Sequence, residues 1–392
     1  MEETKKFSGA SVLSALKQYS MLIALIAVII TFTITTGGKI LLPDNVRNLI
    51  FQNAYVVILA VGMLLCILTG GNIDLSVGSV AGFIGAIAGK LIIENKFNVY
   101  VSIVICLIFG ILVGMWHGFW IAYVKIPPFI VTLTGMLIFK GLNLIILGAM
   151  TLSPYPDSFL VLSTKSFPSI GKFQGLDLTS MLTGIAVVII FAVATTLSRI
   201  RKTKKGYEND SIISFLLKLI LMAAAVIFIA YKLASSNGMP TVLLILAIIT
   251  LAYAYLTNKT VAGRYLYAIG GNQKAARLSG INTNKAFFLV YTNMAFLAAV
   301  CGLVTAARLN SSTPTAGQGY EMDAIASCFI GGASAYGGIG TVSGALIGAA
   351  FMGVLNMGMS IMGVAPEVQS VVKGLVLLLA VAFDVVSKRK TK

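Results

Sequence analysis

Runs of about twenty apolar residues recur along almost the whole chain, separated by short polar loops. An apolar helix of that length can cross the hydrocarbon core of a bilayer. Hydrophobic residues make up 58% of the 392 residues and charged residues only 11%, which is more apolar surface than a soluble protein of this length can bury. The sequence therefore predicts an all-α polytopic membrane protein, with a single membrane-spanning domain over residues 1–392.

The apolar segments predict ten to twelve transmembrane helices. They lie near residues 21–34, 48–69, 75–94, 101–124, 128–150, 181–198, 211–231, 240–256, 286–307, 323–337, 341–362 and 368–387. The first segment is followed by no small-x-small cleavage site, so we interpret it as an uncleaved span and not as a signal peptide. Segment 323–337 is short and interrupted by glycine, which indicates a half-helix or a re-entrant element.

Basic residues predict the orientation of these helices. They concentrate in the loop 199–209, in the loop 257–285 and in the C-terminal tail. Short cytoplasmic loops are enriched in Lys and Arg, so these regions and both termini are expected on the cytoplasmic side. The same rule accounts for the net charge of +16, and nucleic-acid binding is therefore not indicated. The longest loop on the opposite side, about residues 151–180, is expected to be a solvated connector or a docking surface for a soluble partner.

The polar stretch 263–280 interrupts the apolar pattern. Asn272 is a favourable N-cap, and Gly280 suits the position that ends a helix. The helix predicted between them has about two turns, and an isolated helix that short is marginal in water. It is either an ordinary capped loop helix or a cytoplasmic helix held by another protein. The candidate docking residues are Gly270, Gly271, Asn272, Ala275, Ala276, Arg277 and Gly280.

Two glycine-rich segments, Thr69–Ser79 and Gly331–Gly344, break the apolar runs. Irregular backbone at membrane depth persists only where protein or a water-filled cavity covers it. An acidic residue there costs about 2.5–3.5 kcal/mol on insertion scales, so Asp74 is either a pathway residue or a cap for the following helix. Residues 77–82 also match residues 339–344 position by position, and paired broken helices are typical of transporters built from repeats.

Other polar residues extend this candidate pathway. Lys140 lies near the middle of its span, where an ion pair inside the bundle and a position along the path are both compatible with the sequence. The candidate pathway residues are Asn72, Asp74, Ser76, Lys140 and Tyr336. Glycines spaced four apart, at 110, 114 and 118, predict close helix packing.

Several chemistries lack the residues that they need. The chain contains no Gly-x-x-x-x-Gly-Lys-Ser/Thr motif, so it is not expected to bind and hydrolyse ATP through a P-loop. Its four cysteines lie in apolar segments without a Cys-x-x-Cys pair, and it has one histidine, so no metal site is predicted. No catalytic cluster stands out, and an enzyme is not indicated.

Four motifs in order resemble the permease subunits of bacterial monosaccharide ABC importers of the ribose, galactose and xylose type. They are residues 69–78 (TGGNIDLSVG), 127–133 (PPFIVTL), 267–272 (YAIGGN) and 331–341 (GGASAYGGIGT). The resemblance runs from about residue 45 to the C-terminus. The additional helix pair at 211–256 is most similar to the longer xylose or multiple-monosaccharide branch. Asn72, between Gly71 and Ile73, is an additional polar residue relative to the family pattern.

The resemblance implies a homodimeric pore in the bacterial cytoplasmic (inner) membrane. It further implies a separate ATPase subunit that carries ATP and Mg²⁺, an extracytoplasmic sugar-binding protein, and a coupling role for residues 272–280 within the loop 257–285. No cofactor is expected on this chain. The alternatives are import of a nucleoside, an autoinducer or a branched-chain amino acid by the same machinery, or an ion-coupled secondary transporter.

Overall fold

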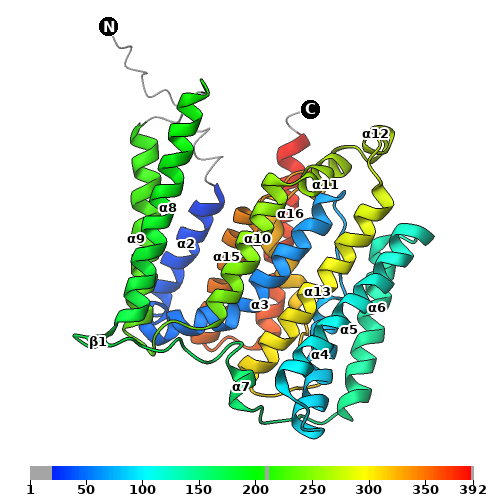
Figure 1. Cartoon of the computed structure of the whole chain (residues 1–392), viewed down its shortest axis with the longest axis horizontal. Helices are drawn as coiled ribbons and strands as arrows, with labels where there is room; N and C mark the ends of the chain where they lie inside the picture. Colours follow the sequence, from blue (N-terminus) through cyan, green and yellow to red (C-terminus); the bar gives the residue numbers. More distant parts are fainter. Residues whose placement is uncertain (1–19, 208–211, 390–392) are drawn as a thin grey trace.

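The computed structural model describes residues 20–207 and 212–389, and these residues are almost entirely helical (Figure 1). The membrane-length and shorter helices are α2 (Ser20–Thr35), α3 (Pro43–Leu68), α4 (Val77–Gly89), α5 (Val99–Phe119), α6 (Pro128–Leu147), α7 (Asp157–Leu160), α8 (Leu178–Lys204), α9 (Ile212–Ala234), α10 (Val242–Lys259), α11 (Val261–Gly271), α12 (Gln273–Leu278), α13 (Thr283–Leu309), α14 (Tyr320–Ile330), α15 (Val342–Ile361) and α16 (Pro366–Arg389). Short helical segments η1 (Lys39–Leu41), η2 (Lys90–Glu94) and η3 (Trp120–Val124) and a two-stranded hairpin, β1 (Lys172–Phe173) and β2 (Leu176–Asp177), complete the described elements.

The predicted all-α membrane fold is confirmed. Within the described residues, ten helices are long and apolar enough to cross a membrane. The remaining two predicted segments correspond to the 16-residue α2 and the 11-residue α14. The half-helix expected at 323–337 is therefore present, but it begins earlier, at Tyr320, and ends at Ile330. Residues 331–341 follow it as an irregular loop.

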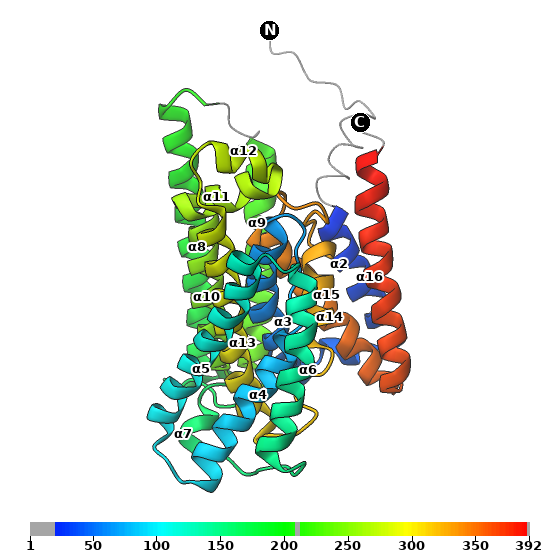
Figure 2. The same ribbon diagram turned by 90° about the vertical axis from the view of Figure 1, so that its right-hand side faces the viewer.

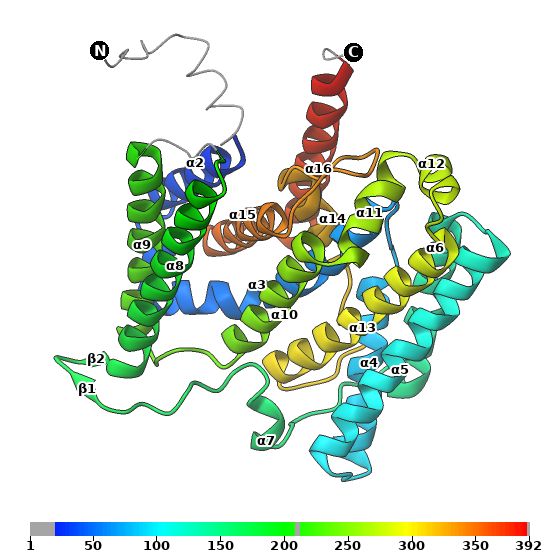
Figure 3. The ribbon, with the colours of Figure 1, turned by 45° about the horizontal axis from the view of Figure 1, so that its top comes forward.

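Helices α3 and α13 form the centre of the molecule, with α4, α5, α14 and α15 packed around them (Figure 3). The side chains of α3 and α13 are buried along most of their length, whereas α8, α9, α10 and α16 bury little in this single chain. The close packing predicted from the spaced glycines is also found. A Cβ added at Gly114 would lie 2.5 Å from the Cα of Thr292, so α5 approaches the backbone of α13.

The basic regions share one end of the molecule. The start of α2, the end of α16, the end of α8 and the α11–α12 pair all lie there, whereas α7 and the β1–β2 hairpin lie at the opposite end (Figures 1 and 2). Every described region that the basic residues predict to be cytoplasmic thus lies at the same end of the molecule. The terminal residues 1–19 and 390–392, which are also predicted to be cytoplasmic, lie outside the described residues.

The long loop between α6 and α8 is exposed along much of its length but is anchored on the bundle at several points. Tyr155 and Phe159 are buried in the core, with stacked rings. The loop forms isolated β-bridges to the segment after α13, through Leu152 and Ser312, and to the α9–α10 connection, through Ser166 and Pro240. These contacts fix the loop on the bundle because its aromatic side chains gain more by burial than by exposure.

Candidate functional site

The short helix α12 is capped as the sequence predicts. The backbone N–H of Ala275 donates a hydrogen bond to Oδ1 of Asn272 at 3.0 Å, which makes Asn272 the N-cap. Gly280 has a φ of +84°, and the backbone N–H of Ile281 donates to the carbonyl of Ala276 at 3.1 Å. Glycine adopts this left-handed conformation without steric cost, so it ends the helix.

The six residues of α12 present one exposed face and one attached face. Ala276 is buried against the chain's own core, whereas the candidate residues Gly271, Asn272, Ala275, Arg277 and Gly280 are exposed. Leu278 is 91% exposed, although it is a large apolar side chain at the end of a helix that packs only lightly on α13. An apolar side chain so fully exposed is available for contact with another protein. Sequence reasoning did not select Leu278, because its exposure depends on how α12 is placed.

At the end of α11, Gly270 contacts two other segments through backbone atoms. A Cβ added at Gly270 would lie 1.9 Å from the carbonyl oxygen of Leu68 and 2.3 Å from the backbone N of Gly338. The N–H of Gly338 in turn donates to the Leu68 carbonyl at 3.1 Å. We call this contact, made by Leu68, Gly270 and Gly338, the glycine junction. It connects α11 to the end of α3 and to the loop 331–341.

Neighbouring contacts strengthen the glycine junction. The hydroxyl of Tyr267 donates to the carbonyl of Gly340 at 2.8 Å. Burial raises the pKa of Tyr267, so the hydroxyl remains a donor at neutral pH. The loops 69–76 and 331–341 also touch directly, because a Cβ at Gly337 would lie 2.4 Å from the Cα of Gly70. Both predicted glycine-rich segments therefore meet near the C-terminal end of α11.

In the loop 69–76, the candidate pathway residues bond mainly to the loop itself. Oδ1 of the buried Asp74 accepts hydrogen bonds from the backbone N–H and the hydroxyl of Ser76, at 2.8 and 2.6 Å. The side-chain amide of Asn72 donates to the carbonyl of Thr69 at 3.3 Å. The Asp74 carboxylate thus orders the turn immediately before α4 without capping the helix, because its bonds go to Ser76, which occupies the N-cap position without a side-chain cap hydrogen bond.

A second broken element lies beside the first. The coil between α13 and α14 follows α4 so closely that a Cβ at Gly78 would lie 2.1 Å from the carbonyl oxygen of Gly317. Helix α14 begins next to the start of α4 and runs alongside α3. The Cys328 thiol of α14 donates to the Ala60 carbonyl of α3 at 3.2 Å. The two short helices α4 and α14 thus start side by side and run in opposite directions (Figure 2). Half-helices that start near one another line the pathway in many transporters.

Asp323 in α14 organises a buried polar network that sequence reasoning missed. Its Oδ2 accepts hydrogen bonds from the hydroxyl of Tyr55, from the side-chain amide of Asn356 at 3.3 Å and from Nζ of Lys373 at 3.0 Å. The carboxylate is 1% exposed and the lysine side chain 24%. Four helices, α3, α14, α15 and α16, are joined by this one group. The signal was available in an acidic residue at the start of a glycine-interrupted apolar segment.

The remaining candidate residues lie on separate elements. Lys140 is exposed on α6 and forms no salt bridge within the described residues, whereas its neighbour Asn143 is buried and donates to the carbonyl of Pro314 at 3.2 Å. Tyr336 is 62% exposed in the loop 331–341, next to Gly71. Asp384 on α16 accepts from the backbone N–H of Ala335 at 3.2 Å and holds that loop.

The described residues form a polytopic bundle with two opposed half-helices and a capped helix at the basic end. The chain belongs to the family described as "Branched-chain amino acid transport system / permease component", which matches residues 45–381.

Relatives of known function match nearly the whole chain. The chain is 38% identical to "Xylose transport system permease protein XylH" of Escherichia coli (strain K12), over 98% of this chain and 95% of the relative. It is 37% identical to the protein of the same name from Haemophilus influenzae, over 96% of this chain and 98% of the relative. It is 34% identical to "Ribose import permease protein RbsC" of Escherichia coli (strain K12), over 94% of each chain. No solved structure matches this chain.

Proposed function

We propose that this chain is the membrane-spanning subunit of an ABC importer that passes a monosaccharide into the cytoplasm by alternating access. ATP and Mg²⁺ bind to a separate ATPase subunit, an extracytoplasmic binding protein delivers the sugar, and two copies of the chain form the pore in the bacterial inner membrane. The observation that supports this proposal most strongly is the match of nearly the whole chain to xylose and ribose permeases. The glycine junction, which connects an exposed helix to both broken segments, supports the coupling path.

The coupling path starts at α12. The ATPase covers the exposed face around Leu278, while the buried Ala276 attaches the helix to the bundle. Movement of α12 is transmitted through α11 to Gly270, which touches the end of α3 and the loop 331–341 in backbone contact. Because backbone contacts have no flexible side chain to absorb a shift, the loops before α4 and α15 move with α11. Each nucleotide state of the ATPase then favours one face of the bundle.

The proposed substrate is a pentose. The relatives that match nearly the whole chain are named for xylose and ribose transport, and this supports a monosaccharide. Import of a branched-chain amino acid is the second candidate, because the family description names that substrate. Asn72, Asp74, Ser76, Lys140 and Tyr336 remain the proposed pathway residues, with Asp74 acting through the position of its loop.

The test is uptake of radiolabelled xylose into cells that carry the chain with its ATPase and binding protein. We expect uptake that excess unlabelled xylose or ribose reduces and that excess leucine leaves unchanged. Uptake should stop on ATP depletion and persist when the proton and sodium gradients are dissipated. Competition by leucine instead of pentoses would replace the substrate assignment, and uptake that follows an ion gradient without ATP would contradict the proposed mechanism.

A further inference from the structure

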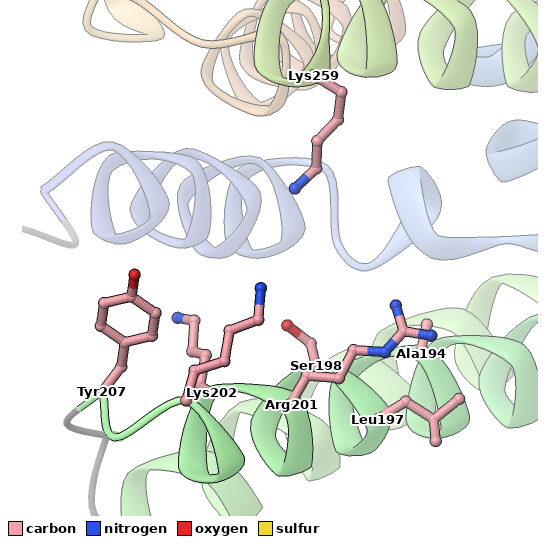
Figure 4. Close-up of a pocket in the computed structure, with 8 residues that line it drawn as sticks. Ala194, Leu197, Ser198, Arg201, Lys202, Tyr207 and Lys259 are labelled. Carbon is pink, nitrogen blue, oxygen red and sulfur yellow. The ribbon is translucent and has the colours of Figure 1, made fainter.

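A basic cleft lies between α8 and the end of α10, at the end of the molecule that carries the basic regions (Figure 4). Its volume is about 850 Å³. Arg201, Lys202 and Lys205 line it from α8 and the residue that follows, and Lys259 lines it from the last turn of α10. Figure 4 shows Lys202 extending toward the side on which Lys259 lies. Two separate helices therefore supply positive charge to one space.

Nothing in the described residues neutralises these four cations. The salt bridges found there involve Lys90, Lys165 and Lys373, and none involves a residue of the cleft. A cation at the end of α8 or α10 is favourable for the helix dipole, but that effect does not explain why the cations of two helices face one another. Like charges that converge repel, so the arrangement is stable when an anion lies between them.

The remaining lining residues match a phospholipid better than a free ion. Ser198 and Tyr207 contribute hydroxyl groups beside the cations, whereas Ala194 and Leu197 form an apolar wall. Along the same helix, toward the middle of the membrane, Ile190 is 67% exposed and Val193 is 52% exposed. A soluble phosphate ion makes no favourable contact with an apolar wall, whereas the acyl chains of a lipid pack against one. Basic pockets between transmembrane helices on the cytoplasmic side suit anionic lipid headgroups.

We propose that this cleft binds the headgroup of an anionic phospholipid. The phosphoryl oxygens lie among Arg201, Lys202, Lys205 and Lys259 and accept hydrogen bonds from Ser198 and Tyr207, and the acyl chains follow the exposed face of α8. Helix α8 packs chiefly on α9. The lipid therefore connects the α8–α9 hairpin to α10, which leads directly into α11.

The test compares two variants with equal charge loss. Lys202→Gln/Lys259→Gln removes one cleft cation from each helix. Lys204→Gln/Lys218→Gln removes two exposed cations of the same hairpin that do not line the cleft. Each purified protein is delipidated in detergent and titrated with phosphatidylglycerol, and retained lipid is counted by native mass spectrometry. A Lys or Arg near an anionic lipid contributes about fivefold in affinity, so the cleft variant should bind its tightest lipid about 30-fold more weakly than wild type. The control variant should bind as wild type does.

Further titrations identify the source of the anion. Phosphatidylcholine should not replace phosphatidylglycerol. Inorganic phosphate at about 10 mM should not displace phosphatidylglycerol either. Equal lipid binding by wild type and the cleft variant, or equal loss in both variants, would contradict the proposal. Displacement by inorganic phosphate would also overturn it and would make the cleft a site for a soluble phosphate. Unchanged size-exclusion profiles and helical circular dichroism verify that each variant is folded.

Discussion

At Gly270 one hydrogen atom occupies the place where any other residue would carry a side chain. Gly270→Ala would bring a Cβ within 1.9 Å of the Leu68 carbonyl oxygen, so α11 must shift away from both loops. Overpacking of this kind costs about 1–3 kcal/mol. We expect sugar uptake to fall by about tenfold, because 1.4 kcal/mol lies within this range and corresponds to a factor of ten. The ATPase should still co-purify, because α12 itself is intact.

Gly141→Ala, in α6 and outside the docking helix, is the matched control for this prediction. A Cβ at Gly141 meets nothing within 4 Å, and its backbone does not have a positive φ. This variant should transport sugar at the wild-type rate. Equal loss of uptake in both variants, measured in the same cells at equal expression, would mean that the contact with Leu68 and Gly338 does not transmit movement.

Asp323 and Lys373 give a second prediction at this scale. Asp323→Asn leaves the partly buried Lys373 without its counter-charge, and breaking a buried pair by removing one partner costs about 3–5 kcal/mol. The double variant Asp323→Asn/Lys373→Gln removes both charges. Thermal unfolding in detergent should show a larger decrease in Tm for Asp323→Asn than for the double variant. A double variant that is less stable than Asp323→Asn would indicate that the pair acts through more than its charges.

These residues also show how far local reasoning reaches. The cap at Asn272 and the helix end at Gly280 were predictable, because both depend on a few neighbouring residues. The pairing of Asp323 with Lys373 joins residues 50 positions apart, and the glycine junction joins three segments of the chain. No local propensity encodes such contacts, so only the folded arrangement brought them together.

At the scale of elements, one residue of α12 attaches the helix to the bundle and another is proposed to bind the ATPase. Leu278→Asp places a charge on a side chain that is 91% exposed without touching the core, so we expect the ATPase to be lost from the purified complex. Leu278→Ala should retain most of the binding. Ala276→Asp would bury a charge and detach α12 from the bundle, which should lower Tm as well. Undiminished recovery of the ATPase with Leu278→Asp would exclude this face as the docking surface.

On the opposite side, Asp177 caps α8 and anchors the β1–β2 hairpin. Ser180 donates to Oδ2 of Asp177 through its backbone N–H at 2.8 Å and through its hydroxyl at 2.6 Å. Burial alone would raise the pKa of Asp177, but hydrogen bonds from Ser169 and Ser180, together with nearby Lys172, hold it below its ordinary value. The charged carboxylate therefore stabilises the folded state above the ordinary carboxyl pKa, and this contribution is lost as the pH falls through the lower folded-state pKa.

Asp177→Ala should accordingly destabilise the protein by about 1 kcal/mol at neutral pH. The difference in Tm between wild type and variant should shrink as the pH falls below about 4, where the carboxylate of the unfolded state becomes protonated before that of the folded state. Thermal unfolding followed by circular dichroism over this pH range measures both. A difference that is constant with pH would show that the charge of Asp177 is not involved.

The half-helices show which features of the elements could not be predicted from the sequence. The apolar pattern identified the twelve segments, and the broken helix near residue 323 was recognised from its length and glycines. The match of residues 77–82 to residues 339–344 did not give the register of the two helices, because α4 starts at Val77 whereas α15 starts at Val342, three positions later in the match. Small and branched residues alone do not fix a register. The opposed pair in the structure is α4 and α14. The coil 310–319, which leads into α14, had no distinguishing sequence pattern.

At the scale of the whole molecule, the directions of the helices bring the basic regions of the sequence to one end. The basic regions and the short helix α12 lie together there, and the loop between α6 and α8 occupies the other end (Figure 1). The basic cleft lies at the same end as α12. The helices that bury little in a single chain, such as α16, leave apolar faces for lipid or for the second copy. The sequence predicted this polarity because it depends on composition, which does not require knowledge of contacts.

The central claim is that α12 faces the cytoplasm and is covered by an ATPase. All four native cysteines are buried, so Leu278→Cys provides a single exposed thiol. Its reaction with a membrane-impermeant maleimide would be measured in inside-out vesicles, with and without the ATPase subunit. We predict rapid labelling of the bare vesicles and at least about tenfold slower labelling once the ATPase is bound, since a docked side chain is open less than a tenth of the time. Labelling only from the external face, or equal rates with and without the ATPase, would contradict the account.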